Sequence, residues 1–393
     1  MTDDSLSSAL ALPTIDGAAA PLRSRLPLAA VDRAAWEALA ADRIEGNGLF
    51  EPGFALPAGD LAGGSSALLA YGPNQRRLLG LLPVISAWRA LKLPLKMLVA
   101  TEGYTVLSTP LLDRADPVAA AEGLIEAARQ AGAAVLMLPF MAIEGPAATA
   151  LREAMARRGV TGTIDNSRQR AALDASGDAE AYLRAGLGAK KLKELRRLAN
   201  RMADEGAVQF AEAREPGAIA AALERFLKLE ASGWKGRRGT GLGQDAADAR
   251  FIRAAAAGLA TRGQFSVLEL TLDEKLVAAG LVIRQGDHAI FFKIAYDEAY
   301  SRYSPGVQLT VELTRRLCAD PAIRFADSIA VEGHPMIDHV WRERLAIGDL
   351  YIPTGRGGVA ASAIIGLAIA RRRLRARAKS LYHAIRSSRE KRT

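Results

Sequence analysis

The stretch from Gln264 to Leu317, "QFSVLELTLDEKLVAAGLVIRQGDHAIFFKIAYDEAYSRYSPGVQLTVELTRRL", decides the fold. Its first part predicts three antiparallel strands, because apolar runs are separated by polar turns at 273–275 and 285–287. An apolar helical pattern then follows Ser304, Pro305 and Gly306. A serine cap, a proline at the first helical position and a glycine that permits close approach are typical of a helix start. The outward N–H groups favour a phosphate, and simple capping is the alternative.

The sequence around this stretch predicts an α/β (α+β) fold. Two helices precede the meander, and a strand (323–331), a short helix (334–345) and a last strand (348–352) follow it. Residues 31–172 have a similar but weaker order of strands and helices. One helix there is well defined, with Asp116 as its cap, Pro117 at its first position and Gly132 after its end. We therefore expect two mixed, largely antiparallel sheets flanked by helices.

A basic helix at 178–206 joins the two parts. Six Lys and Arg residues lie in about three turns of it: Lys190, Lys191, Lys193, Arg196, Arg197 and Arg201. This ridge either holds phosphates of a cofactor or RNA, or is the solvated face of an amphipathic helix. The predicted division of the chain is an N-terminal extension (1–30), a first domain (31–177), this helix (178–206), a second domain (207–354) and a tail (355–393).

The tail carries the net charge of the protein. Residues 371–393 contain ten of the 52 Lys and Arg residues and one of the 43 acidic residues, so the rest of the chain is neutral. The apolar run 359–370 is too short to cross a bilayer. Leu367, Leu374, Leu381 and Ile385 share one helical face among arginines, which predicts either a helix on an anionic membrane surface or one that packs on its own protein. The neutral body argues against a nucleic-acid partner.

The single cysteine, Cys318, excludes a disulfide framework and a thiolate metal cluster. The acidic start "MTDDSLSSALALPTIDG" is unlike a signal peptide. We expect a cytoplasmic protein, peripheral at the inner face of the membrane if the tail binds there. Runs of the form G-x-x-x-x-G-K-[ST], G-x-G-x-x-G and G-x-S-x-G are absent from the sequence, which disfavours a P-loop, a dinucleotide fold and a serine hydrolase.

Three segments, "AKKLKELRRLANRMADEG", "FLKLEASGWKGRRGTGLG" and "KIAYDEAYSRYSPGVQLTVEL", resemble the acyltransferase domain of CelD-like proteins. These cellulose-biosynthesis-associated proteins are a FemAB-related branch of the GNAT superfamily. The resemblance covers residues 178–352 and implies tandem GNAT-like domains, the first of them degenerate. It implies acyl-CoA, acetyl or longer, as the acyl donor without a metal, and an amine or hydroxyl acceptor such as a small molecule or glycan precursor.

The resemblance also implies roles for individual residues. The helix start would place the CoA pyrophosphate at Arg302, Ser304, Gly306 and Val307. Backbone N–H groups of the strand from Ile294 to Tyr296 would stabilise the oxyanion. The candidates for the general base are Glu230, His334 and Asp338. Tyr303, or equally Tyr300, would protonate the thiolate, and Trp234 and Lys235 would line the acyl or acceptor pocket.

The end of the resembling region departs from the CelD-like pattern. Where such chains have Gly-Asp-x-x-Tyr-Lys-x-x-Trp, this one reads "GHPMIDHVW", with His334 and Asp338 in place of the Asp and Lys. The acceptor is therefore left open. Two other classes also stay open: an aminoacyl-tRNA-dependent transferase of the FemAB type, and a non-catalytic scaffold at the membrane.

Overall fold

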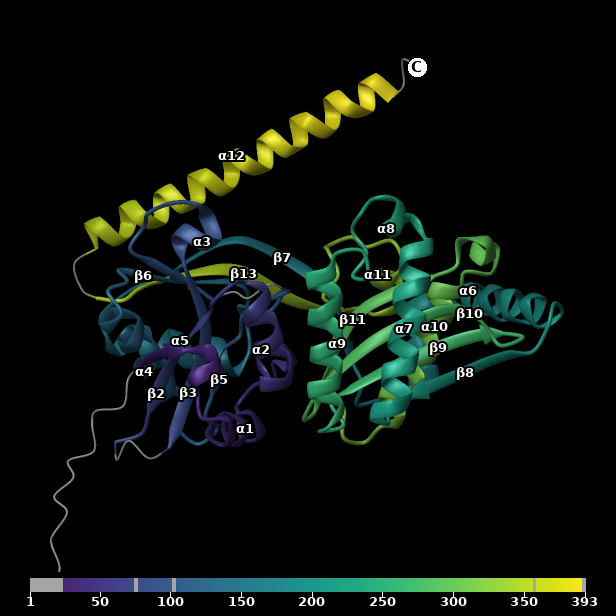
Figure 1. Cartoon of the computed structure of the whole chain (residues 1–393), viewed down its shortest axis with the longest axis horizontal. Coiled ribbons are helices and arrows are strands. Elements are labelled where there is room, and N and C mark those ends of the chain that lie inside the picture. The colour runs from purple at the N-terminus through teal and green to yellow at the C-terminus, as the bar shows by residue number, and fades with distance from the viewer. Residues whose placement is uncertain (1–23, 74–76, 101–103, 356–357, 391–393) are drawn as a thin grey trace, which may run out of the picture.

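The computed structural model describes residues 24–73, 77–100, 104–355 and 358–390, so most of the predicted extension (1–30) lies outside it. The described strands form one continuous sheet in the order β1-β2-β3-β4-β6-β13-β7-β12-β11-β10-β9-β8, and β5 pairs with β3. Their pairings are antiparallel except for two parallel ones, β4 with β6 and β11 with β12. Figure 1 shows two halves side by side, with β7 and β13 running between them.

The first half (24–174) has helices packed on a strongly apolar sheet. The predicted cap of α4 is confirmed, because Asp116 accepts a hydrogen bond from the Ala119 N–H and Pro117 is the first helical residue. The elements of this half are β1 (Arg25–Pro27), α1 (Arg33–Ala41), α2 (Pro52–Leu61), β2 (Ser66–Tyr71), β3 (Leu78–Ser86), α3 (Ala87–Leu91), β4 (Met97–Val99), β5 (Leu111–Leu112), α4 (Pro117–Gln130), β6 (Val135–Ala142), α5 (Pro146–Arg157) and β7 (Thr163–Asp174), with short 3-10 turns η1 (Leu28–Ala30) and η2 (Gly48–Phe50).

The second half (178–340) contains the meander that the sequence predicts. Strands β9, β10 and β11 pair in antiparallel register, and β8 extends the sheet beyond β9. The elements of this half are α6 (Ala179–Ala203), β8 (Val208–Ala213), α7 (Pro216–Ser232), α8 (Trp234–Arg237), α9 (Ala246–Ala260), β9 (Phe265–Leu272), β10 (Lys275–Gln285), β11 (His288–Tyr296), η3 (Glu298–Tyr303), α10 (Pro305–Ala319), β12 (Phe325–Asp327) and α11 (Ile337–Val340).

The last strand, β13 (Glu343–Pro353), lies in the first half although the sequence assigns its residues to the second domain. It pairs with β6 from Ile347 to Pro353 and with β7 from Glu343 to Tyr351. The strand is buried on both faces over most of its length, which a position between two strands requires. Residue order alone does not reveal such distant partners, so the predicted second domain, 207–354, includes a strand that pairs with β6 and β7.

The connecting helix α6 has an exposed basic face and a buried apolar face. Leu192 and Leu195 are buried against the second half, whereas Lys190 and Lys191 are exposed. Gly188, with φ 74° and ψ 159°, breaks the helix near its middle. Part of the basic charge is neutralised locally, since Arg197 pairs with Glu194 at 2.6 Å. These contacts favour the amphipathic-helix interpretation of the segment.

Among the side chains of the C-terminal helix α12 (Val359–Glu390) that the structure describes, those near its beginning pack on the first half. Ala361, Ile365 and Ala368 are buried in a cluster with residues of α3, β4, β6 and β13. The apolar face that the sequence predicts is not the face that packs on the body, because its residues Leu367 and Leu374 are exposed. The side chains of Leu381 and Ile385 lie outside the described residues. Among the described helices, none is both long and apolar enough to cross a membrane.

Candidate active site

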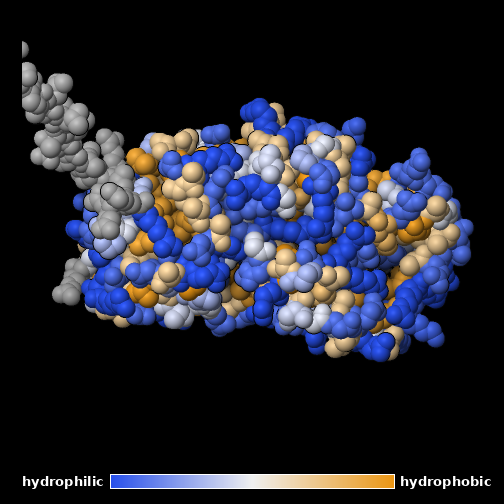
Figure 2. All heavy atoms as spheres, turned by 90° about the horizontal axis from the view of Figure 1, so that it is seen from below, coloured by the Kyte–Doolittle hydropathy of each residue, from blue (hydrophilic) through white to orange (hydrophobic). Residues whose placement is uncertain are grey.

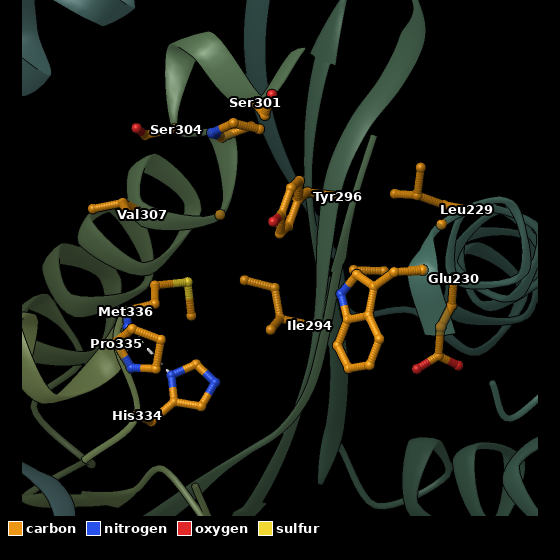
Figure 3. Close-up of a pocket in the computed structure, with 15 residues that line it drawn as sticks. Leu229, Glu230, Ile294, Tyr296, Ser301, Ser304, Val307, His334, Pro335 and Met336 are labelled. Atoms are coloured by element: carbon orange, nitrogen blue, oxygen red, sulfur yellow. Dashed lines mark hydrogen bonds between the residues drawn. The ribbon is translucent and has the colours of Figure 1, made fainter. Parts of the chain in front are cut away.

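A cavity of about 400 Å³ opens where β11 separates from β12. The parallel pairing of these strands ends at Ile290 and Asp327, but β11 continues to Tyr296. The space beside this free length is closed by α7 and α8 on one side and by α10 on the other (Figure 3). This space is here called the first cavity. The residues that line it are Leu229, Glu230, Gly233, Trp234, Ile294, Ala295, Tyr296, Ser301, Ser304, Pro305, Gly306, Val307, His334, Pro335 and Met336.

Gly306 lies at the wall of this cavity, in the first turn of α10. A Cβ added there would be 3.2 Å from Met336 Sδ and 3.3 Å from Tyr296 Cδ1, both of which line the cavity. Within the described residues, the Gly306 N–H has no hydrogen-bond partner, whereas the next two N–H groups bond to the Ser304 carbonyl. The start of the helix therefore presents a free donor and its positive dipole end to an open space.

Ser304 does not cap this helix with its side chain, so that prediction is wrong. The residue has left-handed backbone angles, φ 52° and ψ 51°, because it ends the turn η3 as well as preceding α10. Its carbonyl instead accepts bonds from Val307 and Gln308, at 3.0 and 3.1 Å. The Ser304 side chain is consequently not used up as a cap and lines the cavity.

His334 lines the cavity opposite Glu230. Its Nδ1 accepts hydrogen bonds from the N–H groups of Met336 and Ile337, at 3.3 and 3.5 Å, so the imidazole caps the short helix α11. An Nδ1 that accepts leaves the proton of the neutral ring on Nε2. His334 is therefore arranged to donate a hydrogen bond into the cavity, and not to accept a proton there.

Glu230 is the carboxylate that the structure places at the first cavity. The residue is 2% exposed, and its Oε2 accepts a hydrogen bond from the Leu242 N–H at 2.8 Å. Figure 3 shows Glu230 and His334 on opposite sides, with Ile294 and Tyr296 between them. The buried position holds the carboxylate beside the loop that follows α8, with limited access to water.

The other predicted residues whose side chains the structure describes lie outside the first cavity. Asp338 accepts from the Gly333 N–H at 2.9 Å and closes a turn. Arg302 pairs with Glu205 at 2.6 Å, and the Tyr303 hydroxyl donates to the same carboxylate. That hydrogen bond raises the pKa of Tyr303 above its ordinary value, so the hydroxyl stays protonated and faces Glu205. The side chain of Lys235 lies outside the described residues.

A second cavity of about 300 Å³ adjoins the first, and both are lined by Ile294, His334 and Met336. It lies between β11 and the segment after β12, and the first half supplies part of its wall. The other lining residues are mostly aromatic or aliphatic: Tyr104, Val106, Phe291, Phe292, Lys293, Ser328, Ile329, Ala330 and Ile337. Sequence patterns do not reveal this cavity, because its walls come from segments up to 233 positions apart, Tyr104 to Ile337.

A β-bulge lies at the same place. Leu281 pairs with Lys293 and Val282 pairs with Phe291, so Phe292 is an extra residue in β11. Bulges bend a strand and redirect its side chains, and they are frequent beside active sites. Phe292 and Lys293 both line the second cavity. The apolar run "AIFFKIAY" contains no glycine or proline that would have indicated the bulge.

The comparisons with known proteins agree with this geometry. Residues 189–329 match the model of the acetyltransferase (GNAT) domain family. The chain contains a GNAT-type acetyltransferase domain. This GNAT domain runs from the second part of α6 through β12, and it supplies most of the first cavity and half of the residues that line the second. No curated protein has a sequence that matches this chain.

Solved structures resemble most of the chain and not the GNAT domain alone. FemX is 9% identical with a TM-score of 0.55, covering 84% of this chain and 96% of its own. The C-terminal domain of a putative lysylphosphatidylglycerol synthetase from Agrobacterium fabrum is 14% identical with a TM-score of 0.52, covering 86% and 95%. At these identities the likeness concerns the fold. The predicted fold class, α/β (α+β) with largely antiparallel pairing and flanking helices, is confirmed, but the two sheets expected from the sequence are joined into one continuous sheet.

Proposed function

We propose that the protein transfers an acyl group from acyl-CoA to an amine or hydroxyl acceptor. The observation that carries this proposal is the start of α10, where the free Gly306 N–H meets a cavity that a Cβ would narrow. A helix N-terminus with glycine in its first turn leaves room for a bulky anion such as a pyrophosphate close to the backbone N–H groups. The GNAT match gives independent support for an acyltransferase.

The residues of the first cavity fit CoA. The first turn of α10, with Ser301, Ser304 and Gly306, would hold the pyrophosphate, and Ile294 and Tyr296 would contact the pantetheine arm. Arg302 is next to Ser301, but its guanidinium would have to leave Glu205 to join them. Bound acyl-CoA supplies a thioester, in which the carbonyl carbon is the electrophile and the thiolate is the leaving group.

The junction of the two cavities is the proposed position of the thioester. His334 lies there, and its Nε2–H would stabilise negative charge on the carbonyl oxygen or the departing sulfur. The second cavity, with its aromatic and aliphatic wall, would take the acyl group. Its volume of about 300 Å³ favours an acyl group larger than acetyl.

Glu230 is the proposed general base. An amine acceptor must be neutral before it attacks, so Glu230, across the first cavity from His334, would accelerate the step by taking the proton of an acceptor that lies between them. Trp234, which is 43% exposed, would line the entrance for the acceptor on the same side. Following the CelD-like resemblance, the proposed acceptor is a small molecule or glycan precursor of envelope or polysaccharide biosynthesis.

Calorimetric titration of the intact protein with CoA, acetyl-CoA and a longer acyl-CoA tests the proposal. Saturable binding that strengthens with acyl length is expected for the wild type. The variant Ala330→Phe, which narrows the second cavity, should weaken the longer acyl-CoA about tenfold and leave CoA unchanged. Absence of binding to all three ligands would reject acyl-CoA and favour an aminoacyl-tRNA donor or a scaffold.

A further inference from the structure

The C-terminal helix α12 leaves the body of the protein after its first three turns. Ala361, Ile365 and Ala368 are buried, and the ion pairs of Arg372 and Arg373 with Asp165 are the contacts to the body that lie furthest along the helix among the described side chains. The helix continues to Glu390, about 25 Å further at 1.5 Å per residue. Figure 1 shows this part projecting over the side of the molecule on which α8 and α11 lie.

The projecting helix has an apolar stripe that the body does not cover. Leu367 is 51% exposed and Leu374 is 69% exposed, one heptad apart and so within about 20° of each other on the helix. Both lie on a different side of the helix from the buried Ile365 and Ala368. Trp88 of α3, the helix beneath α12, is 58% exposed as well.

Arginines lie on both sides of this stripe. At 100° per residue, Arg371 and Arg375 lie about 60° and 100° from Leu374 in one direction, and Arg377 and Arg373 lie at the same angles in the other. Among the described residues, Arg375 and Arg377 have no ion-pair partner, and both are exposed. An apolar stripe flanked by arginines suits a helix that lies in the headgroup region of a bilayer.

The opposite face of the protein differs from α12. Figure 2 shows hydrophilic residues spread over that face, with smaller hydrophobic areas between them. The other basic segment, the exposed side of α6, has lysines and arginines but buries Leu192 and Leu195 against its own domain. The combination of exposed leucines and exposed arginines therefore distinguishes α12 from the basic face of α6.

We infer that α12 binds an anionic lipid bilayer through the stripe of Leu367 and Leu374 and the arginines beside it. The arginines pair with lipid phosphates, and the leucines enter the boundary between headgroups and acyl chains. The charge favours anionic over zwitterionic lipid, since each basic residue near such a surface adds a substantial attraction. The helix lies on the membrane and does not span it.

Co-sedimentation of the full-length protein with vesicles tests this inference. Vesicles of phosphatidylcholine mixed with phosphatidylglycerol should retain the protein, and vesicles of phosphatidylcholine alone should not. The double variant Arg375→Glu/Arg377→Glu should weaken retention at least about tenfold. The double variant Leu367→Ser/Leu374→Ser should weaken it severalfold at the same net charge. All four positions are exposed, so circular dichroism should show an unchanged fold.

Two matched controls make the result specific. Lys190→Glu/Lys191→Glu applies the same charge change to the exposed face of α6. Val331→Ser removes an apolar side chain that is 71% exposed but does not lie on α12. Both should retain wild-type vesicle binding. An equal loss of vesicle binding in the α6 variant would overturn the inference. Unchanged vesicle binding in the Leu367→Ser/Leu374→Ser variant would overturn it as well. Tighter binding to RNA than to anionic vesicles, lost with Arg375 and Arg377, would also overturn it.

Discussion

The Nδ1 atom of His334 accepts a hydrogen bond from the Met336 N–H, 3.3 Å away. This bond ties the imidazole to the start of α11 and leaves the proton on Nε2, at the junction of the two cavities. The histidine therefore has a structural role through one nitrogen and a proposed chemical role through the other.

Two substitutions separate these roles of His334. His334→Asn keeps a side-chain acceptor for the Met336 N–H, but its shorter amide does not place a donor where Nε2–H lies, so kcat should fall about 100-fold while Tm stays within a few degrees. His334→Ala loses both functions and should lower kcat and Tm together. Steady-state kinetics and thermal unfolding measure the two quantities. Wild-type kcat in the asparagine variant would assign the histidine to capping alone.

Glu230→Gln tests the proposed base. The glutamine can still accept the hydrogen bond from the Leu242 N–H, so Tm should hold, but it cannot take a proton. We expect kcat to fall by a factor of about 10² or more. At a pH above the pKa of the amine acceptor, the acceptor is already neutral, so part of the lost kcat should return. A variant with unchanged turnover at all pH values would remove Glu230 from the mechanism.

Gly306→Val should weaken CoA binding about tenfold or more, because the side chain enters the first cavity between Met336 and Tyr296. Gly217 is the matched control, since Pro216 and Gly217 begin α7 just as Pro305 and Gly306 begin α10. An added Cβ at Gly217 meets nothing within 4 Å. Gly217→Val should bind CoA like the wild type in the same calorimetric titration, and equal affinities in all three proteins would contradict the proposed phosphate position.

Glu45 makes the stability of the fold depend on pH. Burial raises its pKa from 4.5 to about 7, although the Ala147 N–H donates to it at 2.9 Å. The folded state thus binds this proton more tightly than the unfolded state, and stability falls as pH rises from about 4.5 to 7. Glu45→Gln should raise the free energy of unfolding at pH 8 by about 1 to 2 kcal/mol, discounted for partial exposure, and change it little at pH 4.

Glu126 supplies the comparison of opposite sign. A hydrogen bond from Arg129 lowers its pKa to about 2, so its contribution is present above about pH 4.5 and is lost as pH falls toward 2. Glu126→Gln should therefore lower Tm at pH 8, where Glu45→Gln raises it. Thermal unfolding of both variants at pH 4 and pH 8 checks these predictions. Changes in Tm of the same sign in both variants at pH 8 would refute the raised pKa of Glu45.

Local sequence patterns predicted the elements of this fold well. The helix from Pro117 and the three meander strands follow from caps, turns and apolar periodicity, all of which act over a few residues. Pro305 was likewise placed at the first position of its helix. The break of α6 at Gly188 was missed, because an isolated glycine in a helical pattern is usually tolerated.

The candidate site was predicted less completely, since it depends on contacts between distant segments. Glu230, Gly306 and His334 were proposed from their local surroundings, and the structure brings them to one cavity. The sequence also predicts Arg302 at this site, but Glu205, which is 97 positions away, holds its guanidinium elsewhere. The predicted division of the chain into domains is not tested by the comparisons and stays a prediction.

The position of β13 has a consequence for the order in which the chain can fold during synthesis. The first half is translated early, yet its sheet lacks the strand between β6 and β7 until residues 343–353 emerge from the ribosome. Until then the facing edges of β6 and β7 have no partner, and unpaired edges of this kind promote association between chains. The whole GNAT domain is made in the interval, so nascent chains depend on that domain folding promptly to deliver the missing strand.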